Sequence, residues 1–128
     1  MKLLLDTCTF LWVISGSDRL STPAREAFTI PSNEVYLSAV SAWEISVKWR
    51  LGRLSLAEAP DRLIPRWRQI HGILPLPVDE EACLHEARLP DLHKDPFDRM
   101  LVCQAIVEGM VLLTPDELIR QYPVRSLW

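Results

Sequence analysis

The segment Lys2-Leu3-Leu4-Leu5-Asp6 (KLLLD) gives the clearest indication of the fold. Its three leucines are consecutive and do not alternate with polar residues, a pattern typical of a short strand buried on both faces of a parallel sheet. The run ends at an aspartate, and a carboxylate directly after a buried apolar strand requires a partner for its charge. We therefore expect a parallel sheet with a charged group at the end of its first strand.

Helical and extended patterns alternate along the rest of the chain. They predict strands at residues 35–37, 73–74 and 111–113, an edge strand at 124–127, and helices at 7–14, 22–28, 41–52, 59–71, 79–88 and 96–108. Pro65 predicts a kink in the fourth helix or its division into two short helices, and residues 114–117 should begin another short helix. This alternation indicates an α/β fold whose parallel strands are joined by right-handed crossovers.

Composition excludes several classes of protein. The chain has 128 residues, 48% of them hydrophobic, which predicts one domain with a substantial core. No apolar run reaches the roughly 18 residues of a membrane span, and Asp6 follows the leucines too soon for a signal peptide, so we expect a cytoplasmic protein without membrane contact. The net charge of −3 is not that of a sequence-reading DNA-binding protein, but it does not exclude an enzyme that acts on nucleic acid.

A second segment, His93–Arg99 (HKDPFDR), combines a helix start with an additional acid. Asp95 suits the N-cap, and Pro96 suits the first helical position, where its missing N–H costs nothing. Asp98 gains from the helix dipole, but capping does not require an acid there. The segment therefore leaves open whether Asp98 serves the helix or a chemical site.

Four acids are expected at one edge of the sheet. Asp6 ends the first strand, and Glu44 falls in the first turn of the helix after the second. Asp98 begins the long late helix, and Asp116 follows the strand at 111–113. Ligands of open parallel sheets bind at the carboxyl ends of the strands, and carboxylates gathered there repel one another unless a cation lies among them. Oxygen ligands favour Mg²⁺ or Mn²⁺ over Zn²⁺, which points to phosphodiester hydrolysis.

Each acid also has a structural interpretation when it is considered alone. Glu44 fits a capping box with Ser41, and Asp116 suits a helix dipole. The recurrence of one location in four acids favours a site over four independent caps. His93 and Arg99 lie beside this centre and are candidates for phosphate contact, with solvation on a helix face as the alternative.

The chain resembles the PIN-domain ribonucleases, specifically the VapC-type toxins of bacterial and archaeal toxin–antitoxin pairs. The resemblance rests on residues 3–7 (LLLDT), 41–48 (SAWEISVK), 89–101 (LPDLHKDPFDRML) and 113–116 (LTPD). It implies a single PIN domain over residues 1–128, a three-layer α/β sandwich in which a small parallel sheet of four to five strands is flanked by helices. Cys8 and Cys103 depart from the family, where histidine and alanine are usual.

The resemblance also implies the residues that carry the chemistry. The family's acidic quartet corresponds to Asp6, Glu44, Asp98 and Asp116, and the supporting residues are Asp95 and Thr7. We expect the first and third acids of the quartet to hold the Mg²⁺ or Mn²⁺ ion, and the other two to complete its shell or orient the attacking water. The expected phosphate contacts are Lys48, Arg50 and Arg99.

The function that follows is a metal-dependent endoribonuclease that acts as the toxin of a VapBC-type pair. Its expected partners are an RNA substrate, a cognate VapB-type antitoxin that covers the active site, and a second copy in a homodimer anchored by Trp12 and Trp49. Two alternatives stay open: a PIN-fold nuclease that cleaves DNA or structured flaps, and a non-catalytic binding module whose acids serve only as caps.

Overall fold

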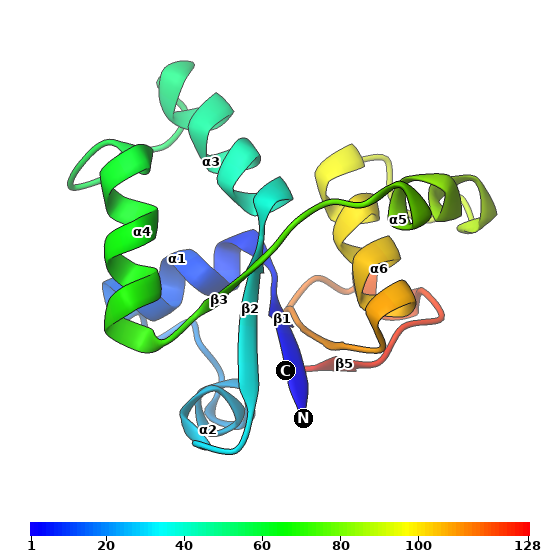
Figure 1. Cartoon of the computed structure of the whole chain (residues 1–128), viewed down its shortest axis with the longest axis horizontal. Helices are drawn as coiled ribbons and strands as arrows, with labels where there is room; N and C mark the ends of the chain where they lie inside the picture. Colours follow the sequence, from blue (N-terminus) through cyan, green and yellow to red (C-terminus); the bar gives the residue numbers. More distant parts are fainter.

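The computed structural model describes all residues from Met1 to Trp128 and contains one sheet of five strands (Figure 1). The strands lie in the order β3-β2-β1-β4-β5, and each neighbouring pair is parallel. They are β1 (Lys2–Leu5), β2 (Glu34–Ser38), β3 (Leu74–Leu76), β4 (Val111–Leu113) and the edge strand β5 (Ser126–Leu127). The parallel sheet with β1 at its centre confirms the predicted fold class.

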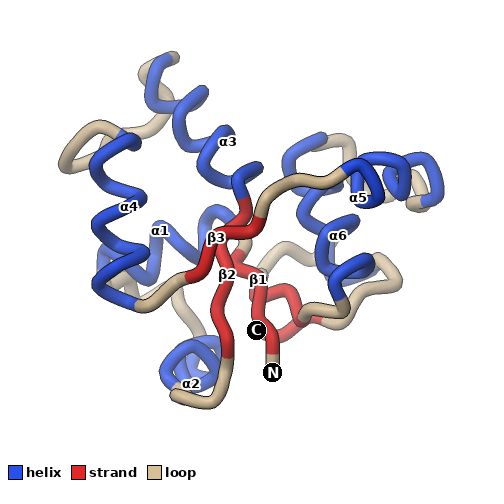
Figure 2. The backbone as a smooth tube through the Cα atoms, in the orientation of Figure 1, coloured by secondary structure: helices blue, strands red, loops and turns tan.

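Helices cover both faces of the sheet, which gives the molecule the three predicted layers (Figures 1 and 2). The first face is covered by α1 (Thr7–Ser15), α2 (Thr22–Thr29), α3 (Ala39–Arg50) and α4 (Pro60–His71). The second face is covered by α5 (Glu80–His85), the 3-10 helix η1 (Glu86–Arg88) and α6 (Pro96–Glu108). None of these helices has the length and apolar character needed to cross a membrane.

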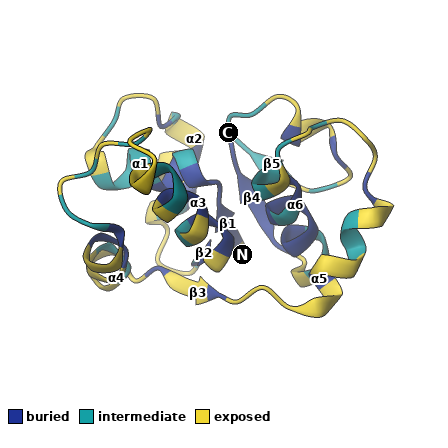
Figure 3. Cartoon of the chain, turned by 90° about the horizontal axis from the view of Figure 1, so that it is seen from above, coloured by how far each residue is buried: buried dark blue, intermediate teal, exposed yellow.

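The leucines of β1 divide between the two cores. Leu3 and Leu5 pack in the core of the first face, whereas Leu4 packs in the core of the second. Successive side chains of a strand point to opposite faces, so three consecutive leucines are what a strand with a core on each side requires. The burial colouring of Figure 3 accordingly shows β1 and β4 in dark blue, together with parts of α6.

The order of the strands creates a switch point between β1 and β4. From β1 the chain runs outward to β2 and β3, then crosses the other face through α5 and α6 and returns to β4 on the opposite side of β1. Leu5 pairs in register with Leu113, and the Asp6 N–H donates to the Leu113 carbonyl at 3.0 Å. The residues that follow β1 and β4 are therefore neighbours at the edge where ligands of such sheets bind.

The start of α3 differs from the prediction. The helix begins at Ala39 with Ser38 as its N-cap, and the Ser38 hydroxyl accepts the Val40 N–H at 3.0 Å. The predicted capping box of Ser41 and Glu44 is therefore wrong, because Ser41 lies inside the helix and Glu44 in its second turn. The serine that directly follows β2 takes the capping role.

Two further elements also differ from expectation. Residues 60–71 form one continuous helix that contains Pro65, so the predicted division into two short helices is wrong. Pro65 and Asp61, the residue whose carbonyl loses a hydrogen bond, are both exposed, so water can satisfy that carbonyl while Leu63 and Ile64 anchor the helix in the core. The short helix expected at residues 114–117 is instead the 3-10 helix η2 (Ile119–Gln121).

Candidate active site

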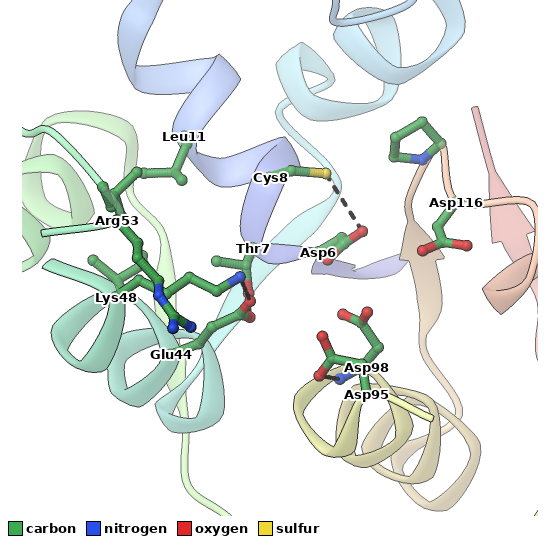
Figure 4. A pocket seen from close by; sticks show the side chains of 13 residues that line it. Asp6, Thr7, Cys8, Leu11, Glu44, Lys48, Arg53, Asp95, Asp98 and Asp116 are labelled. Carbon is green, nitrogen blue, oxygen red and sulfur yellow. Dashed lines mark hydrogen bonds and ion pairs between the residues drawn. The ribbon is translucent and has the colours of Figure 1, made fainter. Parts of the chain in front are cut away.

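A pocket of about 480 Å³ opens at the carboxyl edge of the sheet beside the switch point (Figure 4). Its polar wall contains five acids, namely Asp6, Glu44, Asp95, Asp98 and Asp116. They come from the end of β1, the second turn of α3, the start of α6 and the segment after β4. The structure thus brings together all four acids of the predicted quartet, and their catalytic roles stay predictions.

Asp6 lies at the floor of the pocket and is only 5% exposed. Its Oδ2 accepts the Thr114 hydroxyl at 2.7 Å and the Cys8 thiol at 3.5 Å. Burial raises the pKa of Asp6, and the charge of Glu44 adds to the rise, while these hydrogen bonds act against it. Burial and the charge of Asp6 raise the pKa of Cys8 to about 12, so this thiol stays protonated and serves as a donor.

Glu44 is held on the opposite wall by side chains from two helices. Its Oε1 lies 2.7 Å from the Thr7 hydroxyl, and its Oε2 lies 2.5 Å from the Lys48 ammonium. The Thr7 oxygen also lies 2.9 Å from the Ser41 oxygen. Thr7 has a single hydroxyl proton, so donation to the carboxylate leaves Ser41 as the donor to Thr7. Thr7 therefore contacts a quartet acid directly, and its supporting role stays a prediction.

The two aspartates of HKDPFDR do different things. Asp95 caps α6, because its Oδ1 accepts the N–H groups of Phe97 at 2.8 Å and Asp98 at 3.4 Å. Asp98 points into the pocket toward Asp6 (Figure 4). Burial, followed by the charges of Asp6, Asp95 and the two other quartet acids, raises the pKa of Asp98 to about 8. Asp95 is a helix cap, whereas Asp98 is a carboxyl group whose ionised form is disfavoured by burial and by the neighbouring charges.

Asp116 is fixed through both of its oxygens. Oδ1 accepts the N–H groups of Leu118 at 2.8 Å and Ile119 at 3.3 Å, in the manner of a helix cap. Oδ2 lies 3.2 Å from Nε2 of His93, and the same Nε2 lies 3.1 Å from Oδ2 of Asp98. His93 therefore joins two acids of the quartet, a contact that the sequence did not predict.

One oxygen each on Asp6 and Asp98 has no side-chain partner. Every side-chain hydrogen bond to Asp6 goes to Oδ2, and His93 contacts only Oδ2 of Asp98. By contrast, both oxygens of Glu44 and of Asp116 have partners within the chain. Two carboxylate oxygens without side-chain partners in an acidic pocket fit a hard divalent cation, which prefers oxygen ligands and lowers the cost of gathering the acids there.

The three residues predicted to contact phosphate lie in different places relative to the pocket. Lys48 lines the pocket, and Arg50 is exposed and does not line it. Arg99 is buried on the far side of α6, where it donates to Glu86, to the Pro90 carbonyl and to the Tyr122 hydroxyl. The prediction for Arg99 was wrong because its donors are already used in holding the 86–99 segment together.

Arg53 is a pocket cation that sequence reasoning missed. Gly52 adopts a left-handed conformation (φ 73°) after α3, and the Arg53 N–H donates back to the Lys48 carbonyl at 2.8 Å. This turn brings the Arg53 guanidinium beside Lys48 at the mouth of the pocket (Figure 4). No ion pair within the chain involves Arg53, so its donors are free for a ligand. The glycine at the helix end was the only sequence signal for this position.

A carboxylate-lined pocket at the switch point of a parallel five-stranded sheet defines the class of protein, an α/β domain with an acidic ligand site. The family model described as PIN domain matches residues 3–124. The chain therefore belongs to the PIN domain family.

One curated protein is similar to this chain in sequence, and several solved structures are similar to it in fold. Ribonuclease VapC16 of Mycobacterium tuberculosis is 40% identical over 53 residues, which are 41% of this chain and only 38% of that relative's length. The crystal structure of VapBC2 from Rickettsia felis, bound to a DNA fragment from its promoter, matches 99% of this chain and 98% of that chain with a TM-score of 0.75 at 12% identity. DNA-bound VapBC from Salmonella typhimurium matches 99% and 97% with a TM-score of 0.68 at 20% identity.

Proposed function

We propose that this PIN domain is a metal-dependent endoribonuclease that hydrolyses RNA phosphodiester bonds and acts in the cytoplasm as the toxin of a VapBC-type pair. The observation that carries the proposal is the gathering of four acids in one pocket, where one oxygen each of Asp6 and Asp98 has no side-chain partner. The relative named as a VapC ribonuclease and the VapBC structures support the same assignment. The acids are not caps alone, because Asp6 and Asp98 cap no helix through their side chains.

The carboxylate oxygens of Asp6 and Asp98 that have no side-chain partner support their assignment as metal ligands. Asp6 and Asp98 would hold a Mg²⁺ or Mn²⁺ ion through Oδ1, while Glu44 and Asp116 face the same space with both oxygens already fixed by the chain. A bound ion would supply Lewis-acid stabilisation of the phosphate and a more acidic water. The raised pKa of Asp98 is the expected property of a carboxyl whose neighbours are arranged for a cation.

The remaining polar residues would hold the substrate and the water. Lys48 and Arg53 lie together at one wall and would bind phosphate oxygens, Arg53 with donors that nothing else uses. Glu44 is fixed by Thr7 and Lys48, so its carboxylate is positioned to accept a hydrogen bond from the attacking water. Asp6 is buried and the side chain of Asp98 is 15% exposed, so both carboxyl groups are largely shielded from bulk solvent.

The proposed partners are an RNA strand, a VapB-type antitoxin and a second copy of the chain. The antitoxin assignment rests on the VapBC complexes that share the fold. Of the two predicted dimer anchors, Trp49 is 42% exposed, whereas Trp12 packs against Trp128 with 5.7 Å between ring centroids. Trp49 is therefore the better candidate anchor.

The proposal is tested by incubating the purified chain with single-stranded and structured RNA in Mg²⁺, in Mn²⁺ and in EDTA. We expect cleavage with either ion, none in EDTA, and none by Asp6→Asn. Asp18→Asn is the matched control, because Asp18 is an exposed aspartate outside the pocket. Undiminished cleavage in EDTA, or full activity of Asp6→Asn, would reject this mechanism.

A further inference from the structure

His93 contacts two acids of the pocket but has no role in the proposed reaction. It lies in the segment before α6 and is half-buried, with a side chain 17% exposed. Its backbone N–H donates to the Tyr122 hydroxyl at 2.8 Å, and the same hydroxyl lies 3.1 Å from Nη1 of Arg99. Because Arg99 is in turn anchored by Glu86, the backbone of His93 is tied to the packed second face of the sheet.

The ring of His93 is oriented by a second contact. Its Nδ1 accepts the backbone N–H of Asp95 at 3.1 Å. A ring nitrogen that accepts a hydrogen bond carries no proton, so the proton of the imidazole is on Nε2. Asp95 thus caps α6 with its side chain and fixes the His93 ring with its backbone.

The Nε2–H of His93 faces two carboxylates at once. It lies 3.1 Å from Oδ2 of Asp98 and 3.2 Å from Oδ2 of Asp116. One polar side-chain atom from each of these three residues lies within 4.8 Å of the other two. A shared donor between two like charges offsets part of their repulsion and fixes which oxygen of each carboxylate faces the other.

We propose that His93 is a positioning residue that holds Asp98 and Asp116 by their Oδ2 atoms and so leaves Oδ1 of Asp98 available to the ion that the pocket would bind. This inference rests on the proposed metal-dependent function and assigns His93 neither a phosphate contact nor direct contact with the ion. Hydrogen-bond partners of this kind orient metal ligands, and their loss typically costs about 10- to 100-fold in metal affinity. This role would explain why His93 precedes Asp95 and Asp98 in the HKDPFDR segment.

Two substitutions separate a positioning role from simple filling of space. Glutamine places an amide N–H near the location of Nε2, whereas asparagine is shorter and places its donor near the location of Nδ1. We expect His93→Asn to weaken Mn²⁺ binding by about 10- to 100-fold, and His93→Gln to retain most of the affinity. Mn²⁺ binding is measured from the electron paramagnetic resonance signal of the free ion, with unfolding curves to show that each variant is folded. The control is His71→Asn, at an exposed histidine on α4.

The outcomes keep this inference distinct from the proposed function. If the parent binds Mn²⁺ and cleaves RNA while His93→Asn binds as tightly, or if both variants lose affinity equally, the positioning role is rejected and the ribonuclease assignment stands. If the parent binds Mn²⁺ with the expected His93 dependence but cleaves no RNA, the function is rejected instead. A parent that binds no Mn²⁺ overturns both.

A spectroscopic measurement on the parent protein does not depend on the folding of any variant. Long-range ¹H–¹⁵N correlation spectra distinguish a ring nitrogen that carries a proton from one that does not. We expect the His93 ring to show the proton on Nε2 in the protein kept in EDTA. The opposite tautomer would overturn the proposed contacts.

Discussion

Asp95 and Asp98 show how two acids in one turn acquire different roles. The Asp95 carboxylate satisfies two backbone N–H groups at the start of α6, whereas the Asp98 carboxylate faces the charges of the pocket. Successive helical residues point in different directions, so the cap and the site do not compete for the same side chain. The cap orders the turn that carries Asp98, and Asp98 supplies the chemistry.

Substitution should separate these two roles. Asp95→Ala should lower the free energy of unfolding by about 1 kcal/mol, the usual cost of a lost N-cap. Asp98→Asn should leave the stability of the protein in EDTA unchanged or raised, because it removes a carboxyl whose ionisation the pocket and the neighbouring charges disfavour. Urea unfolding in EDTA measures both effects. Equal destabilisation by the two substitutions would show that Asp98 also serves the helix.

The raised pKa of Asp98 predicts how stability depends on pH in the absence of metal. The folded carboxyl titrates at about 8 and the unfolded one at 3.8, so between these values the folded state binds the extra proton. The free energy of unfolding should then fall as the pH rises, with the stabilisation fully present below the unfolded pKa and lost as the pH passes the folded one.

Unfolding curves in EDTA from about pH 5 to about pH 9 test this dependence. Asp98→Asn does not titrate and should show a shallower decline, with a remaining slope from Asp6, whose pKa burial also raises. An identical decline in the parent and in Asp98→Asn would contradict the assignment of the shifted pKa to Asp98.

Hydrophobic periodicity predicted nearly every strand and helix, but the direction of individual side chains depended on tertiary contacts. The bounds of α6 were predicted correctly because Asp95, Pro96 and Gly109 mark its ends locally. The start of α3 was not, because Ser38 and Ser41 are both suitable caps and the pairing of β2 decides between them.

The site residues that local sequence patterns mark were predicted, whereas those that depend on tertiary contacts were not. Asp6, Asp98 and Asp116 were found because each follows a strand or begins a helix, positions that sequence patterns locate well. Glu44 was found although it lies in the second turn of α3, one turn later than predicted. Arg99 was assigned to the pocket because it adjoins Asp98 in sequence, yet on a helix the next residue faces elsewhere, and Arg99 points to Glu86. Arg53 was missed because only the turn at Gly52 returns it to the pocket.

The turn after α3 carries a prediction of its own. Arg53→Gln should weaken binding of a short RNA by about tenfold, or about 1.4 kcal/mol, through loss of one charged phosphate contact. Arg50→Gln, three residues earlier and outside the pocket, should bind as the parent does. Fluorescence anisotropy with Asp98→Asn as the common background measures binding without cleavage. The reverse ranking of the two arginines would show that RNA does not approach along this wall.

The strand order explains why segments distant in the sequence share one pocket. The chain leaves β1 toward β3 and returns to β4, which places Asp6 and Asp116 side by side, and the helices of the two faces deliver Glu44 and Asp98 from opposite layers. Each core stabilises one wall of the pocket, so the acids are held against their mutual repulsion by the fold itself.

The oligomeric state of the protein can also be predicted. We expect a homodimer, so light scattering at a concentration of some tens of micromolar, about where obligate dimers stay paired, should give twice the 14.7 kDa chain mass. Trp49→Lys should shift the protein toward the monomer, because charged residues are depleted at the core of an interface. Ile70→Lys, at an exposed position of α4, is the control. A parent protein that is monomeric under these conditions would contradict the prediction.

If the acids at the switch point form a metal site that hydrolyses RNA, one Mn²⁺ titration should show binding and cleavage together. RNA cleavage rate and bound Mn²⁺ are measured in the same samples, for the parent and for Asp98→Asn. We expect the two curves of the parent to rise together with one midpoint, and Asp98→Asn to lose both binding and cleavage. Cleavage that is complete before Mn²⁺ binds, or that persists in Asp98→Asn, would contradict the claim.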